Sequence, residues 1–234
     1  MPSDAQLGHR ERPVPIAAGP AFIFSLIVGW FFLASAVSAQ GVVGSVTAIE
    51  GEATLEHHGR ASKVVPAMAL ETNDRLVTQR SAHLTVTFGD NSSLELGESS
   101  SIVINEGVVG GGAASGISRV GLLGGHLHSI FNAGLRGISP AAFEVRTPNA
   151  IVGVRGTEFD TAYIAGTPCP GFPDCLRYTD VGVYKGRVEV TNPLNPNAPA
   201  VIATSGYETT VPCEQPPAKP SPLGMNEMLS PAYR

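Results

Sequence analysis

Large aromatic side chains are scarce in this sequence, which restricts the ligands that a surface of the protein would recognise. Phe, Tyr and Trp together make up 6% of the residues, and the single tryptophan, Trp30, lies in an apolar run near the N-terminus. Aromatic rings provide the broad apolar faces on which flat ligands such as sugars stack. The composition therefore disfavours a carbohydrate-binding face.

Clusters of basic residues are also missing. The chain has 15 Lys and Arg against 20 Asp and Glu, which gives a formal net charge of −5 at pH 7, and its basic residues are dispersed. Proteins gain most of their affinity for nucleic acids by neutralising phosphates with Lys and Arg. We therefore expect no nucleic-acid partner.

The sequence patterns that mark common catalytic centres are absent as well. No Gly-x-Ser-x-Gly, His-Glu-x-x-His or Cys-x-x-Cys pattern occurs, so the chain offers no nucleophile elbow, zinc-protease helix or redox pair. Glu158 and Asp160 lie two residues apart on an expected strand, and we interpret this isolated carboxylate pair as part of a solvated strand face. We predict a protein that is not an enzyme and that has no cofactor.

One long apolar run is present, near the N-terminus. Residues 21–33 (AFIFSLIVGWFFL) carry no charge, follow a polar start with two arginines, and lead to the small residues Val37-Ser38-Ala39. This order is typical of a secretory signal peptide, here residues 1–39. Because the apolar stretch continues through residues 21–39, an uncleaved membrane tether is the alternative. Both forms predict a domain outside the cytoplasm, either periplasmic or secreted.

Three cysteines follow the apolar run, and an oxidising compartment favours a disulfide between two of them. Cys169 and Cys175 flank a short loop rich in Pro and Gly, CPGFPDC, and we expect these two to pair. A disulfide that closes so short a loop stabilises a fold by only about 2 kcal/mol. Cys213 is then left over, unless it takes one of the other two as its partner.

Apolar and polar residues alternate with a period of two through most of the chain from Val42 onward, and Gly, Asn and Asp mark the turns. This pattern predicts β-strands, and no window shows convincing helical spacing. We therefore expect a single all-β domain over residues 40–211, with a roll-like or solenoid-like arrangement. The Pro-rich residues 212–234 are expected to form a disordered tail.

Three windows share the spacing of strand, glycine turn and strand. They are VTAIEGEATL, VGLLGGHLHS and VGVYKGRVEV, which begin at Val46, Val120 and Val181. A glycine stands five residues after the start of each window, at Gly51, Gly125 and Gly186. Glycine adopts the backbone angles of tight turns and bulges without steric cost. The repeated spacing predicts similar corners that recur in a stacked β architecture.

The segment Phe143–Asp160, FEVRTPNAIVGVRGTEFD, interrupts the strand alternation twice. At Thr147-Pro148 the proline cannot donate a ladder hydrogen bond, so a corner between strands is predicted. Inward apolar positions are even-numbered before Arg155-Gly156-Thr157 and odd-numbered after it, and a one-residue bulge at Gly156 restores a common face. We expect Arg155 to cap the carbonyl groups of this bulge rather than to act in catalysis.

This segment, together with the downstream VGVYKGRVEVTN and VIATSGYETTV, resembles the FecR domain family. Upstream, GSVTAIEGEATL and LETNDRLVTQRSAHLTVTFGDNSSLEL fit the same pattern, with Asp74 and Asp90 where the family has turn aspartates. The resemblance covers about residues 42–211. The insertion between Cys169 and Cys175 and a Gly-rich loop before the second glycine window depart from it.

The resemblance implies an extracytoplasmic all-β domain that senses signals and contacts other proteins of the bacterial envelope. In the best-known members this domain is the periplasmic part of an anti-sigma regulator, which senses siderophore uptake through an outer-membrane receptor and carries a cytoplasmic helical domain before its membrane span. Only residues 1–20 precede the apolar run here, so we expect a stand-alone form. A secreted carbohydrate- or peptidoglycan-binding domain is the alternative function.

His126 and His128 lie two residues apart on an expected strand and therefore on one face of it. Such a pair can bind a metal ion, and His57-His58 would be a source of further ligands. No third ligand is identifiable from the sequence. We therefore expect no metal centre and keep His126 and His128 as candidate ligands.

Overall fold

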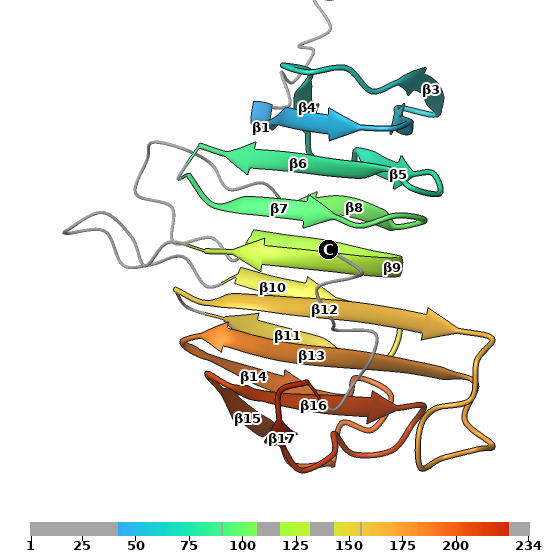
Figure 1. Cartoon of the computed structure of the whole chain (residues 1–234), viewed down its shortest axis with the longest axis vertical. Coiled ribbons are helices and arrows are strands. Elements are labelled where there is room, and N and C mark those ends of the chain that lie inside the picture. The colour runs from blue at the N-terminus through green and yellow to red at the C-terminus, as the bar shows by residue number, and fades with distance from the viewer. Residues whose placement is uncertain (1–41, 90, 107–117, 132–142, 155, 225–234) are drawn as a thin grey trace, which may run out of the picture. The chain divides into compact units, whose positions relative to one another are not determined.

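Two β-sheets that pack face to face make up the described part of the protein (Figure 1). The computed structural model describes residues 42–89, 91–106, 118–131, 143–154 and 156–224, all within the compact unit Ala39–Arg234. These residues form strands and turns, which confirms the all-β prediction. None of these residues belongs to a helix that is long and apolar enough to cross a membrane. The predicted signal peptide, residues 1–39, lies outside the described residues.

The strands follow the alternating pattern of the sequence closely. They are β1 (Val42–Glu50), β2 (Ala53–His57), β3 (Arg60–Lys63), β4 (Ala69–Glu71), β5 (Arg75–Thr78), β6 (His83–Phe88), β7 (Ser93–Leu96), β8 (Ser101–Glu106), β9 (Ser118–Ile130), β10 (Phe143–Arg146), β11 (Ile151–Val154), β12 (Glu158–Ala165), β13 (Arg177–Lys185), β14 (Arg187–Thr191), β15 (Val201–Thr204), β16 (Tyr207–Pro212) and β17 (Ser221–Pro222). The alternation did not indicate β3, β4 or β17, which are short strands without alternating burial.

Each sheet is a stack of strands along the long axis of the domain. Sheet A has the spatial order β4-β1-β6-β7-β9-β12-β13-β16-β17. Sheet B has the order β3-β2-β5-β8-β9-β10-β11-β14-β15. The long strand β9 belongs to both, so that the two layers form one continuous sheet folded over its own core. The pairing of β9 with β10 is parallel and the others are antiparallel.

The core lies between the two layers and is built from the inward side chains of both. In β6 the inward Leu84, Val86 and Phe88 are buried, whereas the alternate residues are half-buried. The same period gives a core of aliphatic residues and phenylalanines that runs the length of the stack. Burial of this apolar surface at about 25 cal/mol per Å² is the main force that holds the layers together.

Corners between the sheets share one backbone device. Nine connections from one sheet to the other contain a described residue in the left-handed region, with φ between 51° and 87°: Gly51, Ala67, Asn73, Ser81, Ser99, Gly125, Gly156, Gly186 and Gly206. Such a residue turns the strand sharply, as glycine corners do in closed β structures. The three glycine windows of the sequence are three of these corners.

Gly156 lies at a sheet crossing and not in a bulge within one strand. β11 belongs to sheet B and β12 to sheet A, so the chain changes layers between them. The parity of the inward positions changes because the chain enters the other sheet. The register irregularity in β12 comes after the corner, between Glu158 and Phe159. Arg155 lies outside the described residues.

The disulfide joins Cys175 to Cys213, so the predicted Cys169–Cys175 pair is wrong. Cys213 follows the end of β16, and the backbone N–H of Cys213 donates to Arg177 O at the start of β13. This register brings Cys175 and Cys213 to a Cα–Cα distance of 5.8 Å. Cys169 is buried as a free thiol, and its burial raises the pKa to about 11. Long-range strand pairing therefore overrides the proximity of Cys169 and Cys175 in sequence.

The ordered domain continues beyond residue 211, where we expected the tail to begin. β17 pairs with β16, and Ala218 N–H donates to Thr210 O. The side chain of Asn192 donates to the carbonyl oxygens of Cys213 and Gln215, both at 2.8 Å. Residues up to 224 thus pack on the end of sheet A. The rest of the predicted tail lies outside the described residues.

Replacing Cys213 with Ser should lower the free energy of unfolding by about 4 kcal/mol, because the disulfide closes a separation of 38 residues. Urea unfolding of the wild type with and without reductant should show the same loss. The matched variant Cys169→Ala should keep its sensitivity to reductant. Sensitivity lost in Cys169→Ala and kept in Cys213→Ser would favour the Cys169–Cys175 pair instead.

Gly125→Ala should destabilise the protein by about 3 kcal/mol. A Cβ at this position would lie 2.6 Å from Ser100 Cα, and φ is +84°. The adjacent Gly124 is the control, since a Cβ there meets no atom within 4 Å. Gly124→Ala should stay within about 0.5 kcal/mol of the wild type. Equal melting temperatures for the two variants would contradict the role of the corner.

Candidate functional site

A polar cluster with buried ionisable groups lies on the outer face of sheet A. His126 and His128 point to this face from β9, and both are more than nine-tenths buried. In the register of the sheet His128 stands opposite Asp160 of β12, and His126 stands opposite Ala162. The sequence correctly placed the two histidines side by side, but it did not indicate their burial or their partner on the next strand.

Asp160 connects the members of this cluster. Its Oδ1 accepts a hydrogen bond from His128 Nδ1 at 2.5 Å, and its Oδ2 accepts one from the Tyr184 hydroxyl at 2.5 Å. His126 Nε2 lies 3.5 Å from Asp160 Oδ2, which is too long for a good hydrogen bond. Asp160 is fully buried, so our interpretation of Glu158 and Asp160 as a solvated pair is wrong for Asp160.

The electrostatics of the cluster favour a charged Asp160. Burial alone would raise the pKa of this carboxyl, but the neighbouring imidazoles of His126 and His128 and the Tyr184 hydroxyl hold it below its usual range. A second acid, Glu158, has its Oε1 3.8 Å from His128 Nε2. The cluster is thus a buried polar network, centred on the Asp160 carboxylate, that connects β9, β12 and β13 across the sheet.

The two histidine pairs predicted from the sequence do not form one metal site. His57 and His58 lie at the turn between β2 and β3, and His57 Nδ1 is 2.6 Å from Asp74 Oδ1. This hydrogen bond raises the pKa of His57. Among the described residues, the three ligand atoms that lie close enough together to share a metal ion belong to His57, His58 and Glu71, and this group does not include His126 or His128.

The Thr147-Pro148 corner between β10 and β11 is fixed by a buried hydrogen-bond network. Thr147 Oγ1 accepts from Ala150 N–H at 2.8 Å and lies 2.7 Å from Thr179 Oγ1 of β13. The Thr179 hydroxyl donates to Asn149 Oδ1, and Asn149 Nδ2 donates to Val211 O, both at 2.6 Å. The network therefore ties a corner of sheet B to β13 and β16 of sheet A. The sequence indicated the corner but not the part played by Asn149.

The second corner in this segment packs against another corner. Thr157 Oγ1 donates to Arg187 O at 3.0 Å, and a Cβ on Gly186 would lie 3.0 Å from Gly156 O. Gly156 and Thr157 therefore stack directly on the Gly186 corner. The contacts of Gly156 and Thr157 therefore hold two corners together, which is a structural role.

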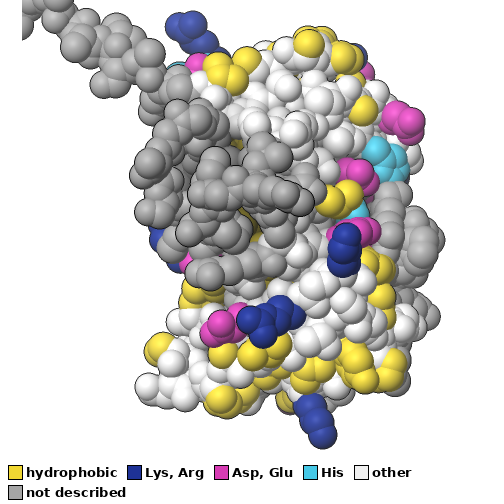
Figure 2. All heavy atoms as spheres, turned by 90° about the vertical axis from the view of Figure 1, so that its left-hand side faces the viewer, with side chains coloured by type: hydrophobic (Ala, Val, Ile, Leu, Met, Phe, Trp, Pro, Cys, Tyr) yellow, Lys and Arg dark blue, Asp and Glu magenta, His cyan; other side chains and the backbone are white. Residues whose placement is uncertain are grey.

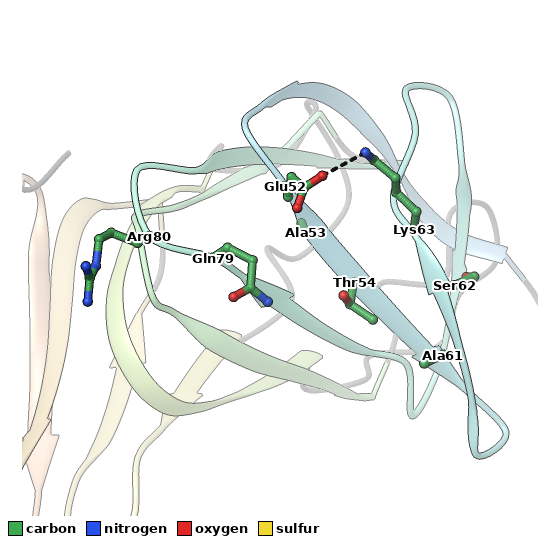
Figure 3. A pocket seen from close by; sticks show the side chains of 8 residues that line it. All are labelled: Glu52, Ala53, Thr54, Ala61, Ser62, Lys63, Gln79 and Arg80. Carbon is green, nitrogen blue, oxygen red and sulfur yellow. Dashed lines mark hydrogen bonds and ion pairs between the residues drawn. The ribbon is translucent and has the colours of Figure 1, made fainter.

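An open groove of about 550 Å³ lies along the β2–β3 hairpin at the N-terminal end of the stack (Figure 3). Its lining consists mainly of small and polar side chains: Glu52, Ala53, Thr54, Ala61, Ser62, Lys63, Gln79 and Arg80. An exposed ion pair joins Lys63 Nζ to Glu52 Oε1 at 3.0 Å. Such a shallow polar groove is suited to an extended chain rather than to a buried small molecule.

Charged side chains of the described residues are dispersed over one face of the molecule. Figure 2 shows Lys and Arg at separate places on one face, between larger areas of polar and apolar atoms. The described residues of that face form no continuous basic patch of the kind that binds nucleic acid.

Comparison with known proteins gives a match to a family model and a weak likeness to solved structures. Residues 74–169 match the family model described as FecR protein, which confirms the resemblance over that range. Two crystal structures, at 2.50 Å and 1.65 Å resolution, of a protein described as a putative anti-sigma factor from Parabacteroides distasonis ATCC 8503 are similar at 19% identity and a TM-score of 0.46. Each alignment covers 63% of this chain and 59% of the other, so this chain spans about three fifths of that protein. No curated protein matches the sequence.

Asp160→Asn should lower the free energy of unfolding at pH 7 by about 3 kcal/mol, because it removes one partner of a buried ionic network. The folded-state pKa of Asp160 is lowered, so its contribution is complete above the unfolded value of about 4 and is lost as the pH falls below that value. Urea unfolding at pH 7 and pH 3 should therefore show a smaller difference between variant and wild type at pH 3. A difference independent of pH would contradict a charged Asp160.

Proposed function

We propose, from the match of residues 74–169 to the FecR family, that this chain is a non-catalytic signalling module of the bacterial envelope. It works outside the cytoplasm and transmits a signal by binding another envelope protein. The family match is the observation that carries the proposal. The signal-like order of residues 1–39 and the absence of common catalytic motifs from the sequence support it.

The β2–β3 hairpin offers the partner a free strand edge. Among the described strands β3 pairs with β2 alone, and its four residues are all exposed. His58 and Gly59 at the turn have φ values of 47° and 75°, as in the two-residue type I′ turn. The closing pair His57–Arg60 then exchanges backbone hydrogen bonds, and the next pair, Glu56–Ala61, does not. The N–H and C=O of Ala61 therefore point away from β2, where an added strand would bind.

The partner that fits this edge is an extended segment with acidic side chains. β3 carries Arg60 and Lys63 although the whole chain has a net charge of −5. The groove of Figure 3 lies beside this strand and is open to side chains of an added segment. Main-chain hydrogen bonds would supply the affinity of such a complex, and the two basic residues would supply its preference for acidic partners.

Ala61→Pro is the variant that tests the edge, because it removes the outward N–H and leaves the hydrogen bonds between β2 and β3 in place. The native protein is crosslinked mildly in its own envelope, purified, and its partners are identified by mass spectrometry. The wild type should recover an envelope receptor or membrane regulator, and Ala61→Pro should lose it while keeping the melting temperature.

The matched control is Ala61→Ser, which keeps the N–H and should retain the partner. Equal recovery with Ala61→Pro would show that the partner binds elsewhere. Recovery of peptidoglycan or glycan alone, with no protein, would favour the carbohydrate-binding alternative.

A further inference from the structure

We propose that His57, His58 and Glu71 form a binding site for a divalent transition-metal ion, with Zn²⁺ and Cu²⁺ as the best-suited ions. One ligand atom from each of these three side chains lies within 4.8 Å of the other two. This inference is independent of the proposed function, because it rests on a different set of atoms from the outward edge of β3.

Three segments of the chain converge at this site. His57 is the last residue of β2, His58 belongs to the hairpin turn, and Glu71 is the last residue of β4. β2 belongs to sheet B and β4 to sheet A, so the ligands come from both layers at one end of the stack. In Figure 1 both β3, which follows His58, and β4, which ends at Glu71, lie at that end.

The turn itself brings the two imidazoles together. Neighbouring residues in a regular strand point to opposite faces, so two successive histidines would normally diverge. Here His58 has a φ of 47°, and its ring meets that of His57 with centroids 4.2 Å apart at an angle of 70°. The left-handed conformation of His58, which is energetically unfavourable for a non-glycine residue, thus places both imidazoles at the site.

Asp74 orients two of the three ligands from below the surface. Its side chain is 2% exposed, and Oδ1 accepts a hydrogen bond from His57 Nδ1 at 2.6 Å. Its Oδ2 accepts the backbone N–H of Glu71 at 2.7 Å. With Nδ1 protonated toward the carboxylate, His57 presents the lone pair of Nε2 outward. A carboxylate that fixes a histidine tautomer in this way is the usual second-shell arrangement of protein metal ligands.

The donor set selects the class of metal ion. Two imidazole nitrogens and one carboxylate oxygen suit Zn²⁺, Cu²⁺ and Ni²⁺, whereas Ca²⁺ and Mg²⁺ prefer sites made of oxygen ligands alone. Three protein ligands leave at least one coordination position for water or for a ligand from another molecule. The His57 side chain is 40% exposed and His58 is exposed, so an ion reaches the site directly from solvent.

The test is calorimetric titration of the full chain with ZnCl₂, CuCl₂ and CaCl₂ in a buffer that does not bind metals, at pH 7.5. His58→Asn removes an imidazole but keeps a residue that tolerates positive φ, and Glu71→Gln removes a carboxylate at constant size. The wild type should bind one equivalent of Zn²⁺ or Cu²⁺ and no Ca²⁺. Each variant should bind at least about tenfold more weakly, with an unchanged melting temperature of the metal-free protein.

His83→Asn, which changes a half-buried histidine outside this group, is the matched control and should bind like the wild type. The visible absorption of bound Co²⁺ gives a second readout, because a tetrahedral site produces far stronger d–d bands than octahedral aqueous Co²⁺, and both variants should lose these strong bands. The site would be overturned if the wild type failed to bind, or if His58→Asn and Glu71→Gln bound as tightly as the wild type.

Discussion

The turn of the chain from one sheet to the other is the constraint on which the rest of this structure depends. Two layers built by one chain require a sharp change of direction at every crossing, and a left-handed residue provides it at each corner described. Glycine adopts that conformation freely, while Asn, Ser and Ala do so at a cost of about 1–2 kcal/mol each. The corners also pack closely, as Gly51 does against Ala82 and Gly125 against Ser100. Burial of the shared core offsets the strain of the corners.

Local patterns in the sequence predicted the strands and several corners, because the alternation of apolar residues and the spacing of glycines act over short distances. They failed where the deciding contact is between distant segments. Cys213 reaches Cys175 through the pairing of β13 with β16, which no local spacing records. The change of parity around Gly156 has the same origin, since a bulge and a change of sheet leave identical traces in the sequence.

Only part of the candidate site could be predicted from the sequence. The spacing of His126 and His128 places both on one face of a strand, but Asp160 and Tyr184 join them only through the register of three strands. The alternating pattern assigns Asp160 to the outer face but does not show whether other parts of the protein cover that face. Asp160 was therefore interpreted as solvated, although it is buried. The hairpin histidines diverge in an extended chain and converge only because His58 adopts a positive φ. For His126, His128 and Asp160 the missing information was the identity of a neighbour on another strand, and for the hairpin histidines it was the backbone conformation of the turn.

β9 has a consequence for how a domain of this kind changes in size. It is shared by both sheets, and among the described pairings no strand before it pairs with a strand after it. The domain therefore consists of two half-stacks of strands, one before and one after β9, and both pair with β9. A layer gained or lost at the outer end of either half would leave the hydrogen-bond register of the other half intact. Such a fold can become longer or shorter at either end while β9 and its pairings stay unchanged.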